Sequence, residues 1–281
     1  MQSTEENPQL STLLRAMTIL EVVVLLGAAS TLFFLPAVSR PNWPWEITPF
    51  NTRFMGAIYV ASLLVVIVLA SNNRWSPARV LLPMIFVFTA WVLLISILYV
   101  ARFDFGKIGT WTWFIFYTLL PINAGYHLWK YRQMPPAVPV VVPNALRLFL
   151  WVLGIGLIVY AAALIVAPPI ATAFWPWSID DFHSRIYAAM FLAGGIGSLL
   201  GARSASAGEL SALGLGQASF GLFALLGLFI VDGEVHKINW SLPGTWVWIA
   251  IFAAALVSGI GYMVLARQKK PLIAAQASQQ M

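Results

Sequence analysis

Eight long apolar stretches constrain this chain more than any other feature of its sequence. A helix needs about 20 mostly apolar residues to cross the hydrocarbon core of a bilayer. The stretches span roughly residues 13–36, 53–71, 79–101, 111–129, 145–168, 184–202, 211–231 and 245–266. The sequence therefore predicts an all-α integral membrane protein with eight transmembrane helices.

Composition excludes a soluble globular fold. Hydrophobic residues make up 60% of the 281 residues and charged residues only 9%, whereas a typical soluble domain has about 25% charged residues. The excess of apolar surface must face lipid. The chain has no Cys, which excludes disulfides, thiolate chemistry and Cys-ligated metals. We expect no cofactor. We also expect no nucleic-acid partner, because the net charge of +6 is spread over short loops and termini.

The basic residues predict the orientation of the chain. The first apolar stretch is longer than a signal-peptide core and lacks a clear cleavage site, so we expect a retained helix. With eight spans, the face that carries both termini holds ten of the 16 Lys and Arg residues. The positive-inside rule then predicts that both termini are cytoplasmic. We expect the cytoplasmic (inner) membrane of a bacterium.

A repeated segment divides the chain into two halves. Positions 43–53 read Trp-Pro-Trp-Glu-Ile-Thr-Pro-Phe-Asn-Thr-Arg, and positions 175–185 read Trp-Pro-Trp-Ser-Ile-Asp-Asp-Phe-His-Ser-Arg. Further along, Gly-Thr-Trp-x-Trp occurs at 109–113 and again at 244–248. Because Trp is only 13 of the 281 residues, these coincidences indicate an internal duplication. A fixed number of positions separates each residue of the first half from its counterpart in the second half. The first offset takes position 43 to 175. Later in the chain a slightly longer second offset takes position 109 to 244.

Each half contains four of the predicted helices. An even number makes both halves enter the membrane in the same direction, so we predict tandem repeats in parallel orientation, related by a pseudo-two-fold axis along the membrane normal. The predicted units are residues 1–133 and 145–281. Segment 134–144 contains four Pro residues, which cannot continue a helix, and it is predicted to be an extended cytoplasmic linker.

The repeated segment supplies the first candidate functional residues. It lies on the predicted outer face, where Trp typically anchors a protein at the lipid headgroups. Our main interpretation is such an anchor, and the alternative is a pair of segments that roof a central cavity. The candidate ligand or lipid-phosphate contacts are Trp43, Trp45, Trp175, Trp177, Arg53 and Arg185.

The two arginines of this group need a partner. Arg53 and Arg185 each stand at the N-terminal end of a predicted helix, where the helix dipole disfavours a cation. A lipid phosphate, or a carboxylate such as Glu46 or Asp181, would make their role structural. The alternative is an anionic ligand held between the halves.

Glu21 is the one acid deep within a predicted helix. An acid at such a position is a functional candidate by default, although it can also be a neutral group hydrogen-bonded within the bundle. Its counterpart in the second half is Leu153, so the duplication did not keep it. Glu21 is our candidate for an intramembrane functional acid.

Histidines and known motifs offer little further chemistry. His127, His183 and His236 are the only histidines, and no two are four residues apart on one helix. His183 and His236 could meet outer-face acids in a metal site, but no spacing requires this, and we predict no metal site. The sequence contains no HExxH, Walker or GxSxG motif, and we name no catalytic residue.

A Gly-rich run in the sixth predicted helix indicates close helix packing. Ala193, Gly197 and Gly201 share one face of that helix, and small residues let helices approach closely in lipid. The contact could lie within the bundle or with another membrane subunit. The predicted partners are therefore the lipid bilayer and such subunits.

Three classes of function remain compatible with the sequence. The first, which we favour at this stage, is a non-enzymatic subunit or scaffold of a membrane complex. The second is a small transporter or channel for a lipophilic or anionic solute, with its path on the pseudo-two-fold axis. The third is a membrane-embedded enzyme with an outer-face site. The absence of a catalytic constellation disfavours an enzyme.

Overall fold

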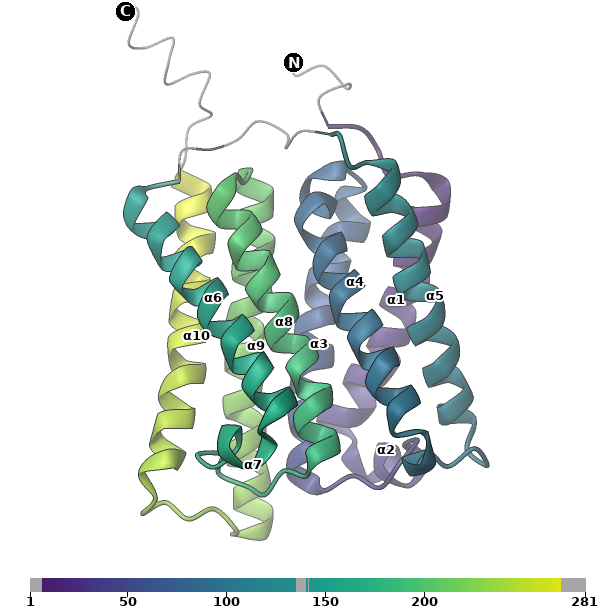
Figure 1. Cartoon of the computed structure of the whole chain (residues 1–281), viewed down its shortest axis with the longest axis vertical. Coiled ribbons are helices and arrows are strands. Elements are labelled where there is room, and N and C mark those ends of the chain that lie inside the picture. Colours follow the sequence, from purple (N-terminus) through teal and green to yellow (C-terminus); the bar gives the residue numbers. More distant parts are fainter. Residues whose placement is uncertain (1–6, 135–139, 141, 269–281) are drawn as a thin grey trace, which may run out of the picture.

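The computed structural model describes residues 7–134, 140 and 142–268, which form a bundle of helices joined by short loops (Figure 1). The elements are α1 (Thr12–Ala29), the π-helix η1 (Ser30–Phe34), α2 (Pro36–Asn42), α3 (Pro49–Asn72), α4 (Trp75–Leu98), the 3-10 helix η2 (Val100–Arg102), α5 (Ile108–Lys130), α6 (Asn144–Val166), α7 (Pro168–Ala171), α8 (Asp181–Arg203), α9 (Ala207–Val235) and α10 (Pro243–Gln268). Each of the eight predicted segments coincides with a long helix, within a few residues at each end.

Seven of these helices are long and apolar enough to cross a membrane, so the protein is an all-α, multi-pass membrane protein. The eighth long helix, α5, has 23 residues, the same length as α6 and α8, but it is not one of the seven. Its Trp, Tyr, Thr and His side chains lower its mean hydropathy. By length and composition, therefore, the described residues contain one membrane span fewer than the sequence analysis predicts.

Polar side chains and prolines fix where the helices begin. The side chains of Ser11, Thr48, Asp180 and Ser206 each accept a backbone N–H bond in the first turn of the helix that follows, which satisfies donors that a helix N-terminus leaves unpaired. Pro occupies the start of α2, α3 and α7, where its missing N–H costs nothing.

Four helices form the centre of the bundle and four lie outside them. In the centre, α3 packs on α9 and α4 packs on α8; outside, α1 packs on α3, α5 on α4, α6 on α8 and α10 on α9. Helices α2 and α7 lie at the end of the bundle opposite the start of α1 (Figure 1). We call this end the Trp-Pro-Trp end, and the other the Glu209 end.

Small residues allow close approach inside the bundle. A side chain at Gly154 of α6 would meet the Gly195 carbonyl oxygen of α8 at 3.0 Å. On the predicted Gly-rich face, a Cβ at Gly197 would lie 2.5 Å from Met84 Sδ, and one at Gly201 would lie 2.9 Å from Leu213. This face therefore packs within the chain, against α4 and α9. A contact of α8 with another subunit stays a prediction.

Most of the predicted Pro-rich linker, residues 135–139 and 141, lies outside the described residues. Val140 donates its backbone N–H to the Ala205 carbonyl at 3.0 Å. Val140 and Val142 pack in a small apolar cluster with Tyr262 at the Glu209 end. Val140 and Val142 thus lie outside any helix and pack against the second half of the chain.

Candidate functional site

Two aromatic clusters occupy the Trp-Pro-Trp end. The first contains Trp43, Trp45 and Trp113, and the second contains Trp175, Trp177 and Trp248. Ring centroids are 4.9–5.7 Å apart in the first cluster and 5.1–6.2 Å apart in the second, all in edge-to-face arrangements. Of the four candidate Trp side chains, Trp43 is partly buried and the other three are buried. They pack inside the protein instead of standing on its surface.

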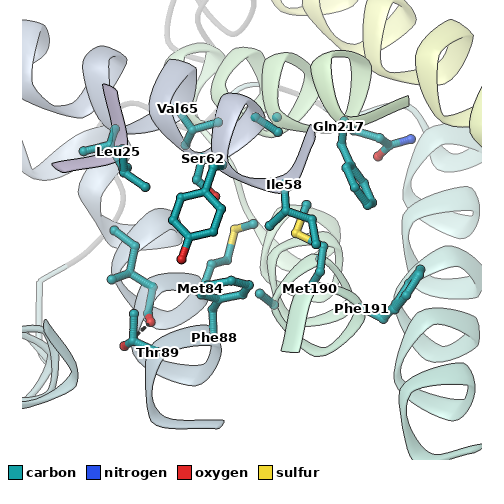
Figure 2. Close-up of a pocket in the computed structure, with 18 of the residues that line it drawn as sticks. Leu25, Ile58, Ser62, Val65, Met84, Phe88, Thr89, Met190, Phe191 and Gln217 are labelled. Atoms are coloured by element: carbon teal, nitrogen blue, oxygen red, sulfur yellow. Dashed lines mark hydrogen bonds between the residues drawn. The ribbon is translucent and has the colours of Figure 1, made fainter. Parts of the chain in front are cut away.

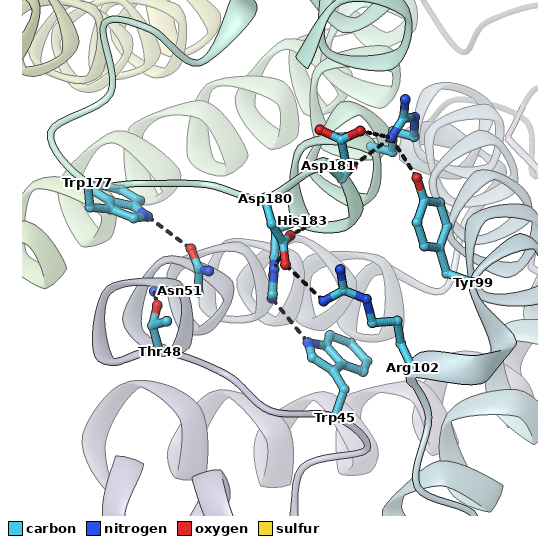
Figure 3. Close-up of polar contacts among 10 residues, drawn as sticks. Trp45, Thr48, Asn51, Tyr99, Arg102, Trp177, Asp180, Asp181 and His183 are labelled. Carbon is cyan, nitrogen blue, oxygen red and sulfur yellow. Dashed lines mark hydrogen bonds and ion pairs between the residues drawn. The ribbon is translucent and has the colours of Figure 1, made fainter. Parts of the chain in front are cut away.

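The two clusters are joined by reciprocal hydrogen bonds across the bundle (Figure 3). Trp45 Nε1 donates to His183 Nε2 at 3.1 Å. Trp177 Nε1 donates to Asn51 Oδ1 at 2.9 Å. Trp45 corresponds to Trp177 by the first offset, and Asn51 corresponds to His183. The two hydrogen bonds are therefore equivalent: in each, the Trp of one half donates to the residue at the same repeat position, 51 or 183, of the other half.

His183 is held from both sides. Its Nδ1 lies 2.7 Å from Asp180 Oδ1, so a neutral ring with the proton on Nδ1 can donate to Asp180 and accept from Trp45. Arg102 NH1 lies 3.1 Å from the second oxygen of Asp180. Burial raises the pKa of the Asp180 carboxyl, but hydrogen bonds from His183 and the charge of Arg102 outweigh it and hold this pKa below its ordinary value.

Arg53 and Arg185 occupy corresponding positions. Arg53 donates to the Phe33 carbonyl and lies 3.2 Å from Glu234 Oε1. Arg185 donates to the Ile165 carbonyl at 3.2 Å, to Asp181 Oδ2 at 3.0 Å and to the Tyr99 hydroxyl at 2.6 Å. Protein groups thus engage both guanidinium groups. Neither arginine lines the large cavity described below.

The outer-face acids and histidines do not gather into a metal centre. Within the described ranges, no group of three or more His, Cys, Asp or Glu residues could hold a metal ion. Asp232 accepts hydrogen bonds from the Ile238 backbone and from Trp240 Nε1, both at 2.9 Å. His127 lies at the other end, where its Nε2 is 2.7 Å from Ser11 Oγ.

A cavity of about 890 Å³ lies between the helices. Pockets that bind drug-sized ligands have volumes of about 300–1,000 Å³. Both halves of the chain contribute to its walls, which are mostly apolar. Figure 2 shows Ile58 and Ser62 of α3, Met84 and Phe88 of α4, and Met190 of α8 around this space. At the Trp-Pro-Trp end, Trp43 and Pro44 also line it.

Glu21 faces this cavity from α1. It is the one charged side chain among the described residues that line it. Tyr59 and Tyr117 line the same space, and their hydroxyl oxygens are 3.0 Å apart. Within the described part of the chain, no hydrogen bond or ion pair engages the Glu21 carboxyl. Glu21 therefore presents an acid to a mostly apolar space.

The polar groups of the cavity are concentrated in one half. Several residues of the first half line the cavity together with their counterparts in the second half. Counterparts are assigned by the first offset in the first two long helices of each half and by the second offset in the last two. At four of these pairs the first half carries the more polar side chain: Glu21 and Leu153, Tyr59 and Phe191, Ser62 and Gly194, and Tyr117 and Phe252. At one further pair, Val66 and Ser198, the second half does.

Two features of the site escaped the sequence analysis. Tyr59 and Tyr117 were not candidates, although comparing the halves at the two offsets reveals their replacement by Phe. The second feature is a bidentate ion pair at the Glu209 end, in which Arg79 Nε and NH2 each lie 2.9 Å from a Glu209 oxygen. No periodicity signals this pair, because its two residues are far apart in the sequence, one in each half.

Comparison of the chain with protein-family models, with curated proteins and with solved structures found no match.

Proposed function

We propose that this multi-pass membrane protein is a small transporter for lipophilic solutes, with its binding site in the central cavity. One observation carries the proposal: a cavity of about 890 Å³ with mostly apolar walls that both halves of the chain build. A space of this size and character suits an apolar molecule better than a hydrated ion. A protein that acts only as a scaffold has no need of it.

We also propose the finer architecture of eight spans in two parallel tandem repeats, with both termini cytoplasmic. Corresponding contacts support it. Arg53 bonds the Phe33 carbonyl as Arg185 bonds the Ile165 carbonyl, and the first offset relates both the donors and the acceptors. The packing of α3 on α9 corresponds to that of α8 on α4. Many transporters are built from such repeats, with the substrate at the repeat interface.

The charge of the cavity argues against an anionic solute. An anion needs a cationic or N–H-rich site, and Glu21 is the one charged group among the described lining residues. Arg53 and Arg185, the candidates for an anion site, already bond carbonyl and carboxylate or hydroxyl oxygens. The alternative role as a subunit of a membrane complex predicts protein partners that co-purify in mild detergent.

Native mass spectrometry of the protein extracted into lipid nanodiscs tests the proposal. We expect the wild-type protein to carry a small apolar molecule that is not a bulk phospholipid. Ser62→Phe, which adds volume inside the cavity, should lose this molecule while remaining folded. Val23→Phe is the matched control, because Val23 is 62% exposed on the outside of α1. Equal amounts of the same lipids in all three proteins would refute a dedicated binding site.

A further inference from the structure

We propose that the cavity selects lipophilic organic cations, and that Glu21 together with the aromatic rings of the same cavity forms the site for the positive charge. The inference rests on the proposed function and names its substrate class. Three properties of the cavity carry it: its charge inventory, its aromatic walls and the difference between its two halves.

The charge inventory is one acid and no base. Among the described residues that line the cavity, Glu21 is the one acid, and no Lys, Arg or His lines it. Isolating a carboxylate in an apolar space is costly, because nothing there replaces its hydration. A ligand that brings a positive charge offsets this cost, whereas an anionic ligand would add a repulsion. The charge inventory therefore favours a cation.

The walls of the same cavity are partly aromatic. Tyr59, Trp113 and Tyr117 line the cavity, and Phe88 of α4 extends the aromatic surface (Figure 2). The centroid of Trp113 is 4.4 Å from that of Tyr117. The face of an aromatic ring attracts alkylammonium and similar cations, and the attraction grows where water is excluded. Aromatic rings and one acid in the same cavity are the expected recognition chemistry for a hydrophobic cation.

The second half of the chain supplies an internal comparison. Leu153, Phe191 and Phe252 line the same cavity at the positions that correspond to Glu21, Tyr59 and Tyr117. At these positions the second half can hold the apolar body of a ligand, and its described residues contribute no acid to the lining. The acid therefore belongs to one side of the cavity alone, which fits an elongated or bulky molecule with one charged end.

The test compares three probes of the same shape and different charge: tetraphenylphosphonium, tetraphenylborate and neutral tetraphenylsilane. Binding to the full-length protein in nanodiscs is measured by equilibrium dialysis, with empty nanodiscs as the reference. We expect tetraphenylphosphonium to bind at least about tenfold more tightly than either other probe. Glu21→Gln should remove this preference, because it keeps the shape of the side chain and deletes its charge.

Two further proteins complete the experiment. Glu46→Gln, the same substitution at an exposed site outside the cavity, should bind all three probes as the wild type does. Ser62→Phe should weaken the binding of every probe. Melting temperatures and gel filtration establish that each variant is folded.

The outcomes separate this inference from the proposed function. Equal binding of the three probes to the wild type, or undiminished tetraphenylphosphonium binding by Glu21→Gln, overturns the cation site. The proposed function survives such a result if Ser62→Phe still abolishes binding. Binding that Ser62→Phe leaves unchanged for every probe overturns both.

Discussion

The Arg79 and Glu209 side chains form the most enclosed ion pair among the described residues. The Glu209 side chain is fully buried and that of Arg79 is 17% exposed. Ser76 and Ser206 surround the pair, with their hydroxyl oxygens 2.6 Å apart. Glu209 also accepts the Ser206 backbone N–H at 2.8 Å, in a capping box at the start of α9. Glu209 thus caps the start of α9 and also bonds Arg79 of the other half.

Breaking this pair should destabilise the protein strongly. Glu209→Gln leaves a largely buried guanidinium without its counter-charge, which we expect to cost about 3 kcal/mol of unfolding free energy. The matched variant is Arg102→Gln, which breaks a pair with side chains 51% and 40% exposed and should cost at most about 1 kcal/mol. Denaturant unfolding in detergent measures both. Equal losses would show that the enclosure of the Arg79 pair does not matter.

At the scale of the element, α5 is the helix whose role is least obvious from composition. Trp113, Tyr117 and Ala124 are buried, whereas Ile108, Trp111 and Ile122 are 55–85% exposed. An apolar exposed face along a 23-residue helix is what a helix in contact with lipid needs. Trp and Tyr lower its mean hydropathy, but both are typical of membrane interfaces. We therefore expect α5 to span the membrane.

The absence of Cys from the chain makes this expectation easy to test. Single cysteines replace Gly106, before α5, and Gln133, after it, and a membrane-impermeant maleimide is applied to spheroplasts and to inverted vesicles. If α5 spans, the two cysteines react from opposite sides. A cysteine at Asn72, the last residue of α3, should react from the same side as that at Gln133. Reaction of positions 106 and 133 from one side would contradict the eighth span.

The sequence predicts the helices well because their signals are local. Apolar length locates them within a few residues, and α2 and α7 each begin at a proline, Pro36 and Pro168. The Trp45–His183 and Arg79–Glu209 contacts are not predictable in this way, because each joins residues from different halves of the chain. The cavity depends on how side chains from eight long helices fill the interior. Of the residues that line it, Glu21 gives the clearest signal in the sequence, because it is an acid at a position where lipid or apolar packing is expected.

At the scale of the whole molecule, the two halves are alike in contacts that hold the bundle together and differ at several positions that line the cavity. The Trp clusters and the two arginines make corresponding contacts in both halves. The positions of Glu21, Tyr59, Ser62 and Tyr117 are polar in the first half alone. Two halves with corresponding contacts and one specialised side are the arrangement we expect of a protein that binds an amphipathic solute asymmetrically.

The most direct test of this account is the accessibility of the interior. In the cysteine-free chain, Ser62→Cys and Gly194→Cys each place a thiol on the cavity wall, one from each half of the chain. Ala57→Cys places one at a position with 0% exposure. We expect N-ethylmaleimide to modify the first two in the folded protein and to leave the third unmodified until the protein is denatured. If positions 62 and 194 prove as unreactive as position 57 in the folded protein, the cavity is closed to solutes and the proposed function is wrong.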